Sequence, residues 1–181
     1  MLDHHPNTIA FAALKNQLMS AGLNRYLPFS TVGQMGATPY LFRSGFNGGI
    51  AFGEDIRGSD YPRELLKQGI AEGKRIRKYF YGNFYPLSEA NTNPRDWCVM
   101  QYHLPDERDG IVMAFRRDQS SYGSYNCGLR EIDPAATYQV KMYYGYDSET
   151  PITISGSDLE KLNITIGERP GSVIVEYQQL K

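Results

Sequence analysis

Cysteine, tryptophan and net charge are scarce in this sequence. Its 181 residues include 2 cysteines and 1 tryptophan, and 19 basic against 20 acidic side chains leave a net charge of −1. Two cysteines are too few for a disulfide scaffold, and Cys98 and Cys127 lack the spacing of a zinc site. Because Cys98 falls within a strand pattern, we expect it to be a buried free thiol. The balanced charge gives no sign of the basic surface that binds nucleic acid or an anionic membrane, so neither is an expected partner.

Long apolar runs are also missing. No stretch approaches the roughly 20 residues that span a bilayer. The start, MLDHHPN, has neither the basic region nor the apolar run of a signal peptide. If Met1 is the natural start, we therefore expect a cytoplasmic protein; in an excised piece the start says nothing about location. We expect no cofactor and no metal, because GFNGG lacks the lysine and spacing of a phosphate loop and His4-His5 has no third ligand nearby.

Helical periodicity marks the first half of the chain. Apolar residues recur at helical spacing up to Gly22, which predicts a helix at about 8–21. Residues 24–49 are rich in turn formers and are predicted to be a long loop, followed by a strand at 49–53. A second amphipathic helix is predicted at about 60–81, with Ser59 or Asp60 as its N-cap. The aromatic segment after it, residues 80–85, is too apolar for a free linker, so we expect it to pack between two structural parts and Tyr85→Ala to loosen them.

The second half alternates with a period of two. Residues 97–102 and 111–116 form a predicted hairpin, with Asp109-Gly110 supplying its turn. Further short strands are predicted at about 122–129, 138–144, 152–155, 164–166 and 172–177, with a helical turn at 158–162. Strands at this spacing, with no second long helix among them, favour an antiparallel sandwich over residues 88–181, with residues 1–87 as a separate part.

Several of these segments, in this order, resemble a known family. The junction between the catalytic barrel and the C-terminal β-domain in α-galactosidases of glycoside hydrolase family 36 and their clan D relatives is similar to three segments of this chain: KYFYGNFYPL, WCVMQYHLP and DGIVMAFRR. The rest of that β-domain resembles GLREIDPAATYQV and the closing strands of this chain. The end of the barrel resembles three earlier segments: GLNRYLPF, PYLFRSG and GIAFGEDIR. The resemblance covers about residues 17–177. It implies a mainly β fold with a helical N-terminal part: an antiparallel β-sandwich preceded by the last βα elements of an incomplete (β/α)₈ barrel, since a whole barrel takes about 250 residues.

The resemblance also implies where a sugar site would lie. The catalytic nucleophile of the family lies upstream of the matched segments, so we expect the chain alone to be inactive. Asp3 occupies the region of the acid/base, but LDHHPN departs from the family's Trp-Arg-Ser-Asp pattern, and the alternative is a solvated N-terminal residue. Asp55 matches an aspartate that follows the last barrel strand. With Glu54 it would line the sugar pocket, or it would belong to a helix-capping network with Arg57 and Asp60. Arg43 would reach a sugar hydroxyl or hold Asp55 by a charge-assisted bond.

Three functions follow as hypotheses. The first is a non-catalytic C-terminal part of an α-galactosidase-like hydrolase, which stabilises the barrel and borders its site for α-galactosides. On this hypothesis the uncovered barrel-facing surface, residues 22–52, would drive self-association. The second is a carbohydrate-binding sandwich with an outer row of aromatics such as Tyr122, Tyr125, Tyr143 or Tyr146. The third is a structural or interaction domain that uses residues 80–85 as an exposed partner surface.

Overall fold

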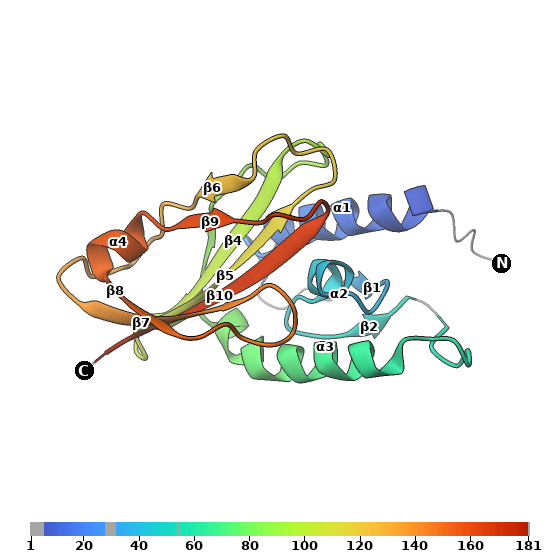
Figure 1. Ribbon diagram of the computed structural model, residues 1–181, viewed down its shortest axis with the longest axis horizontal. Helices are drawn as coiled ribbons and strands as arrows, with labels where there is room; N and C mark the ends of the chain where they lie inside the picture. The colour runs from blue at the N-terminus through green and yellow to red at the C-terminus, as the bar shows by residue number, and fades with distance from the viewer. Residues whose placement is uncertain (1–5, 28–31, 54, 181) are drawn as a thin grey trace.

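The chain folds into a helical part followed by a sheet-rich part (Figure 1). The computed structural model describes residues 6–27, 32–53 and 55–180. The helical part contains, in order, α1 (Pro6–Leu23), β1 (Gly33–Gln34), α2 (Pro39–Gly45), β2 (Ala51–Phe52), α3 (Arg63–Ile76) and the 3-10 helix η1 (Arg77–Tyr81). The predicted ranges 8–21, 49–53 and 60–81 overlap α1, β2, and α3 with η1, respectively.

The prediction that residues 24–49 form a loop is wrong, because β1 and α2 lie within them. Thr38 caps α2 with its side chain, which accepts a bond from the Leu41 amide at 3.4 Å, and Pro39 occupies the first turn. A helix of seven residues and a strand of two are too short to give a periodic signal.

The sheet-rich part is an antiparallel sandwich. Its strands are β3 (Asn83–Pro86), β4 (Trp97–Leu104), β5 (Asp109–Arg116), β6 (Ser124–Asn126), β7 (Thr137–Tyr143), β8 (Ile152–Ser155), β9 (Asn163–Thr165) and β10 (Gly171–Gln179), with the helix α4 (Gly156–Glu160) after β8. Six strands form one sheet in the order β3-β4-β5-β10-β7-β8, and β6 pairs with β9. The predicted fold class is therefore confirmed. The sheet begins at Asn83, ahead of the predicted start of the β part at residue 88.

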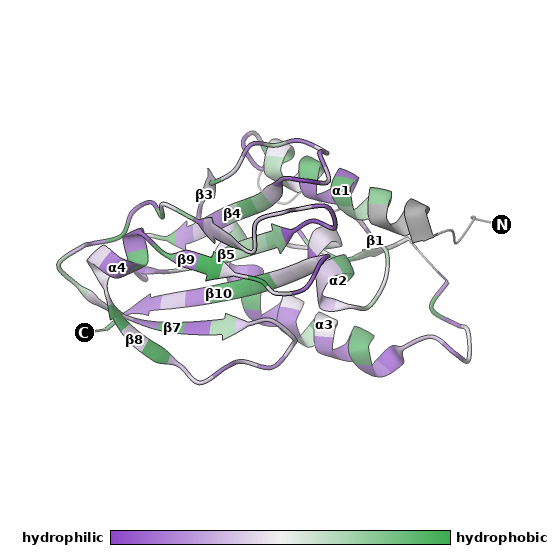
Figure 2. Ribbon diagram, turned by 45° about the horizontal axis from the view of Figure 1, so that its top comes forward, coloured by the Kyte–Doolittle hydropathy of each residue, from purple (hydrophilic) through white to green (hydrophobic). Residues whose placement is uncertain are grey.

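The central strands β4, β5 and β10 of the six-stranded sheet are buried on both faces, whereas the edge strands β3 and β8 are partly exposed. One face of β4 and β5, which includes Met100 and Met113, packs with residues of the helical part. The other face, which includes Val99 and Val112, packs with side chains of β6, β9 and α4. Figure 2 shows hydrophobic stretches in β4, β9 and β10, and Figure 1 shows the helices and the β6–β9 layer on either side of the sheet. Cys98 is buried and free, as predicted, and burial raises the pKa of its thiol to about 11.

The hairpin between β4 and β5 exists, but its predicted turn is wrong. Residues 105–108 make the turn, with an Arg108 amide to Pro105 carbonyl bond of 3.3 Å and a positive φ of 52° at Arg108. Asp109 and Gly110 already belong to β5. Gly110 is needed there for another reason: a Cβ at this position would collide with the Tyr177 hydroxyl.

Aromatic rings join the helical part to the sandwich. Phe80 is 3% exposed, and its ring lies 5.4 Å from Phe46, which directly follows α2, and 4.5 Å from Tyr102 of β4. The packing expected of residues 80–85 is thus found at Phe80, and this burial contradicts the open partner surface of the third hypothesis. Tyr85 instead donates its hydroxyl to Glu131 of the sandwich at 2.6 Å. Its truncation is therefore not the test of the junction that the sequence suggested.

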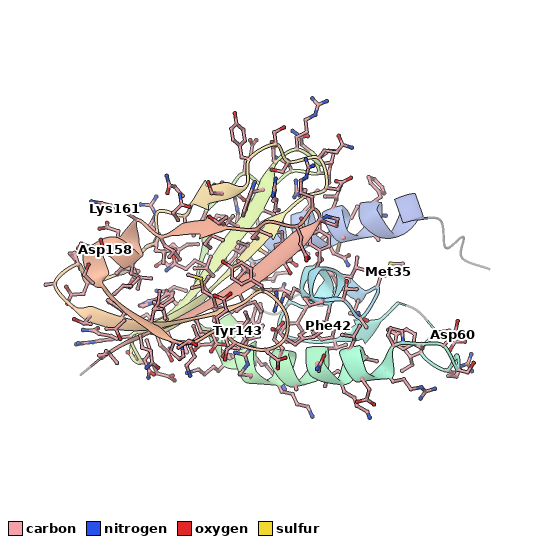
Figure 3. The ribbon with its side chains drawn as sticks, in the orientation of Figure 1. Met35, Phe42, Asp60, Tyr143, Asp158 and Lys161 are labelled. Atoms are coloured by element: carbon pink, nitrogen blue, oxygen red, sulfur yellow. The ribbon has the colours of Figure 1, made fainter. Side chains whose placement is uncertain are left out.

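Glycines allow α2 to lie close against α3. Gly69 and Gly73 are four residues apart on one face of α3 and are both buried. A Cβ at Gly69 would meet the ring of Phe42, and one at Gly73 would meet the ring of Phe46. Figure 3 shows Phe42 between these two helices. The two helices therefore pack closely, and α2 also packs against β1.

Candidate functional site

The candidate site lies at the carboxyl ends of β1 and β2. These strands are parallel, with Gly33 opposite Ala51 and Gln34 opposite Phe52. The Gly53 amide continues the pairing by donating to the Gln34 carbonyl at 2.9 Å. Parallel strands joined by a helix end at the same edge, so the segments that follow β1 and β2 meet there.

A pocket of about 350 Å³ occupies this edge. Its lining comes from the segment after β1 and from the connection between β2 and α3: Gly36, Ala37, Asp55, Gly58, Asp60, Tyr61 and Pro62. Figure 3 shows Asp60 in the connection before α3, at the end of the molecule away from α4. The pocket thus combines backbone groups with two carboxyl side chains.

Asp55 is an exposed carboxylate held by Arg57. The guanidinium donates to both carboxylate oxygens, at 2.8 Å and 2.9 Å, and the Arg57 amide adds a third bond of 3.0 Å. These bonds from Arg57 lower the pKa of Asp55, so this carboxyl is ionised near neutral pH and accepts hydrogen bonds. Asp55 can therefore orient hydroxyl groups, but it is poorly suited to donate a proton as a general acid.

Arg43 does not reach this pocket. Its side chain is 1% exposed, and its guanidinium donates to both oxygens of Glu72 at 2.8 Å. The remaining N–H groups face the carbonyls of Tyr144, Gly145 and Ser172, at 3.3, 2.5 and 3.1 Å. The predicted bond from Arg43 to Asp55 is therefore wrong, and in this structure the donors that a sugar hydroxyl would need are already occupied.

The other two predicted site residues, Glu54 and Asp3, lie outside the described residues. Glu72 was not among the predicted site residues, although the sequence carries a signal for it. Glu72 lies among the buried residues of α3, one turn before Ile76 and one turn after Gly69. A carboxylate on an apolar helix stripe needs a buried partner, and Arg43 supplies it.

The aromatic residues of the second hypothesis do not form an outer row. Tyr143 is 8% exposed, and Tyr146 donates its hydroxyl to the Ala37 carbonyl at 2.6 Å, so both pack against the helical part. Tyr125 donates to the Leu87 carbonyl at 2.7 Å, whereas Tyr122 is 77% exposed. Among these four, only Tyr122 projects from the surface.

Solved structures share this fold. The galactosidase domain of the α-galactosidase–sucrose kinase AgaSK matches with a TM-score of 0.70 and 16% identity, over 93% of this chain and 25% of that chain. The chain has the fold of an α-galactosidase C-terminal region. A variant of the GH36 α-galactosidase AgaA from Geobacillus stearothermophilus, in complex with raffinose, matches with a TM-score of 0.60 and 15% identity, over 78% of this chain and 19% of its own. Another AgaA structure, in complex with 1-deoxygalactonojirimycin, matches with a TM-score of 0.57, 15% identity and the same two coverages.

The chain therefore spans about a quarter of the AgaSK chain and about a fifth of the AgaA chains. No family model and no curated protein matches the sequence. Within the described ranges no helix is long and apolar enough to cross a membrane. The same part of the chain contains no group of three or more His, Cys, Asp or Glu side chains that could hold a metal ion.

Proposed function

We propose that this chain is the non-catalytic C-terminal part of an α-galactosidase-like glycoside hydrolase. In this proposal the sandwich stabilises the barrel, and the pocket with Asp55 borders its sugar site. The observation that supports it best is the position of that pocket at the carboxyl ends of two parallel strands, where barrel enzymes bind their substrates. The raffinose complex of AgaA, which shares the fold, favours α-galactosides as the substrate class.

The chemistry of the pocket is consistent with a supporting role. A retaining glycosidase needs two carboxyl groups about 5–5.5 Å apart, one of them able to donate a proton. Asp55 is ionised and paired with Arg57, so its role in the proposal is to accept hydrogen bonds from sugar hydroxyls. The nucleophile would come from the barrel segments that precede the matched region, and Asp3 as acid/base stays a prediction.

The proposal is tested on the native protein from source cells. An antibody against the sandwich is expected to detect a polypeptide heavier than 20.5 kDa, or a 20.5 kDa chain that co-purifies with a barrel-bearing partner. The captured material is expected to hydrolyse p-nitrophenyl α-galactoside, whereas the isolated 181-residue chain should not. A lone 20.5 kDa chain without activity or partner would overturn the proposal.

In that active protein, Asp55→Asn is expected to raise KM for the galactoside by about tenfold, with a smaller change in kcat. The amide keeps the shape of the carboxylate but removes the charge that strengthens bonds to sugar hydroxyls, which is worth roughly 1.4 kcal/mol. Asp106→Asn, in the exposed β4–β5 turn, is the matched control and should leave both constants unchanged. Equal KM values for the two variants would show that Asp55 does not contact the sugar.

The isolated chain is also expected to self-associate. Four large apolar side chains of α1 and the segment after it are exposed: Phe11, Met19, Tyr26 and Leu27. Tyr26 and Leu27 belong to the predicted barrel-facing segment 22–52, and in the proposal Phe11 and Met19 extend that surface onto α1. When the rest of the barrel does not cover it, this apolar surface favours contact between copies of the chain. Light scattering should show a mass above 20.5 kDa at high concentration, which the double variant Phe11→Ser, Met19→Ser reduces. A monomer at every concentration would contradict this expectation.

A further inference from the structure

A second pocket lies in the sandwich, where two loops meet at one end of β4 and β5. Trp97 begins β4 opposite Arg116 at the end of β5, so the loops 88–96 and 117–123 emerge side by side. The Gln119 amide donates to the Pro94 carbonyl at 3.1 Å, and the Trp97 indole donates to the Tyr122 carbonyl at 3.2 Å. The two loops are therefore bonded to each other.

Arg117 fixes the loop 88–96 by hydrogen bonds from the protein interior. Its side chain is fully buried and donates to the Asn91 side chain and carbonyl and to the Asn93 carbonyl, each at 2.8 Å. Its Nε donates to Gln17 of α1 at 3.0 Å. Charge-assisted bonds of this kind fix the backbone of a loop, so the pocket walls are preorganised.

The pocket has a volume of about 520 Å³, within the roughly 300–1,000 Å³ of small-molecule sites. Its lining combines aromatic, hydroxyl, amide and charged side chains: Ser88, Glu89, Asn91, Arg95, Asp96, Trp97, Ser121, Tyr122, Ser124 and Tyr125. Trp97 stacks on Tyr125, with ring centroids 5.8 Å apart and an interplanar angle of 26°. This stack forms an apolar wall.

Tyr122 adds an uncovered ring. Its side chain is 77% exposed, although its carbonyl is fixed by Trp97. A tyrosine ring that projects into solvent from a bonded backbone offers a large contact area with few rotatable bonds, which is typical of binding surfaces. The neighbouring Asp96 accepts from Asn91 at 2.8 Å, so polar groups border the aromatic wall in ordered positions.

The charges of the lining select the class of ligand. Glu89 and Asp96 oppose the single cation Arg95, so the pocket does not favour a phosphate or another anion. A neutral ligand with one apolar face and several hydroxyl groups fits this chemistry: its C–H face would pack on an aromatic ring, and its hydroxyls would bond to the carboxylate and amide oxygens. We propose that this pocket binds a pyranose unit of a neutral saccharide. The proposal does not depend on the chain being part of a hydrolase.

The single tryptophan of the chain reports on this pocket. Fluorescence of the purified chain is expected to change saturably on titration with raffinose, methyl α-galactoside or cellobiose, and calorimetry should give the same dissociation constant. Inorganic phosphate should give no such change. Absence of a saturable signal with all three sugars, or a signal with phosphate alone, would overturn the proposal.

Variants locate the binding. Tyr122→Ala is expected to weaken the affinity by about tenfold, since the lost ring contact is worth roughly 1 kcal/mol or more. Its side chain is exposed, so its fold should be retained, as thermal melting would verify. Tyr81→Ala, which removes a 67% exposed ring near the opposite end of β4, is the matched control and should bind like the unmodified chain. Equal affinities for the two variants would place the sugar elsewhere on the molecule.

Discussion

Replacing Arg43 by methionine is expected to lower the free energy of unfolding by about 3 kcal/mol, and by as much as about 5 kcal/mol. The Glu72 carboxylate would then lie buried without the guanidinium that donates to both of its oxygens. We expect the lower value, because Arg75 Nη2 lies 3.5 Å from the Glu72 carboxylate and still partly compensates its charge in the variant. Urea unfolding followed by circular dichroism measures the change.

Two further variants sharpen this test. Arg43→Lys should recover only part of the stability, because one ammonium group cannot bond the carboxylate in a paired manner and also satisfy three carbonyls. Arg57→Met breaks an ion pair whose side chains are 87% and 61% exposed, so it should leave the stability unchanged within error. Similar midpoints for the Arg43 and Arg57 variants would show that the buried Arg43–Glu72 pair contributes no more to stability than the exposed Arg57–Asp55 pair.

The sheet-rich part could be predicted because its long strands carry a clear period. β4 and β5 are eight residues long, and their successive residues belong alternately to the two cores, with Met100 and Met113 in one and Val99 and Val112 in the other. The turn between them was misassigned because Asp109-Gly110 is also a common turn pair, whereas here Gly110 makes room for Tyr177. A short-range signal cannot distinguish a turn glycine from one required by a neighbour in space.

The short elements of the helical part could not be predicted. β1 and β2 have two residues each, and their pairing depends on contacts between segments that lie 18 residues apart, as the register of Gly33 with Ala51 shows. α2 is stabilised by rings that lie over Gly69 and Gly73 of α3, which no local pattern of α2 reveals. Tertiary packing, rather than local propensity, creates these elements.

The position of Asp55 could be predicted from the sequence, whereas its role at a sugar site stays a prediction. Asp55 lies at a strand end beside a pocket, where its place in the sequence suggested, and its partner is Arg57. Arg43 was expected near it, but the nearest buried carboxylate in space is Glu72, which follows 29 residues later. The pocket around Tyr122 depends on Arg117 to hold two loops together, so only the folded structure shows its walls.

Replacing Phe80 by alanine is expected to cost about 3–5 kcal/mol, since the ring is 3% exposed and would leave a cavity between helix and sheet. The ring makes edge and tilted contacts with Phe46 and Tyr102, so its loss weakens both sides of the junction. We expect the helical part to melt at a lower temperature than the sandwich in this variant, because the sandwich retains the second core on the other face of its sheet. Far-ultraviolet circular dichroism of the helices and fluorescence of Trp97 follow the two parts separately.

Tyr122→Ala is the matched control, because it removes an aromatic ring that is 77% exposed. Its melting temperature should equal that of the unmodified chain, with both probes changing together. If Phe80→Ala also melted in one transition at the original temperature, the helical part would not depend on this ring. If both probes shifted downward together, the two parts would form one cooperative unit, and the sandwich would owe its stability to the helices as well as to its own core.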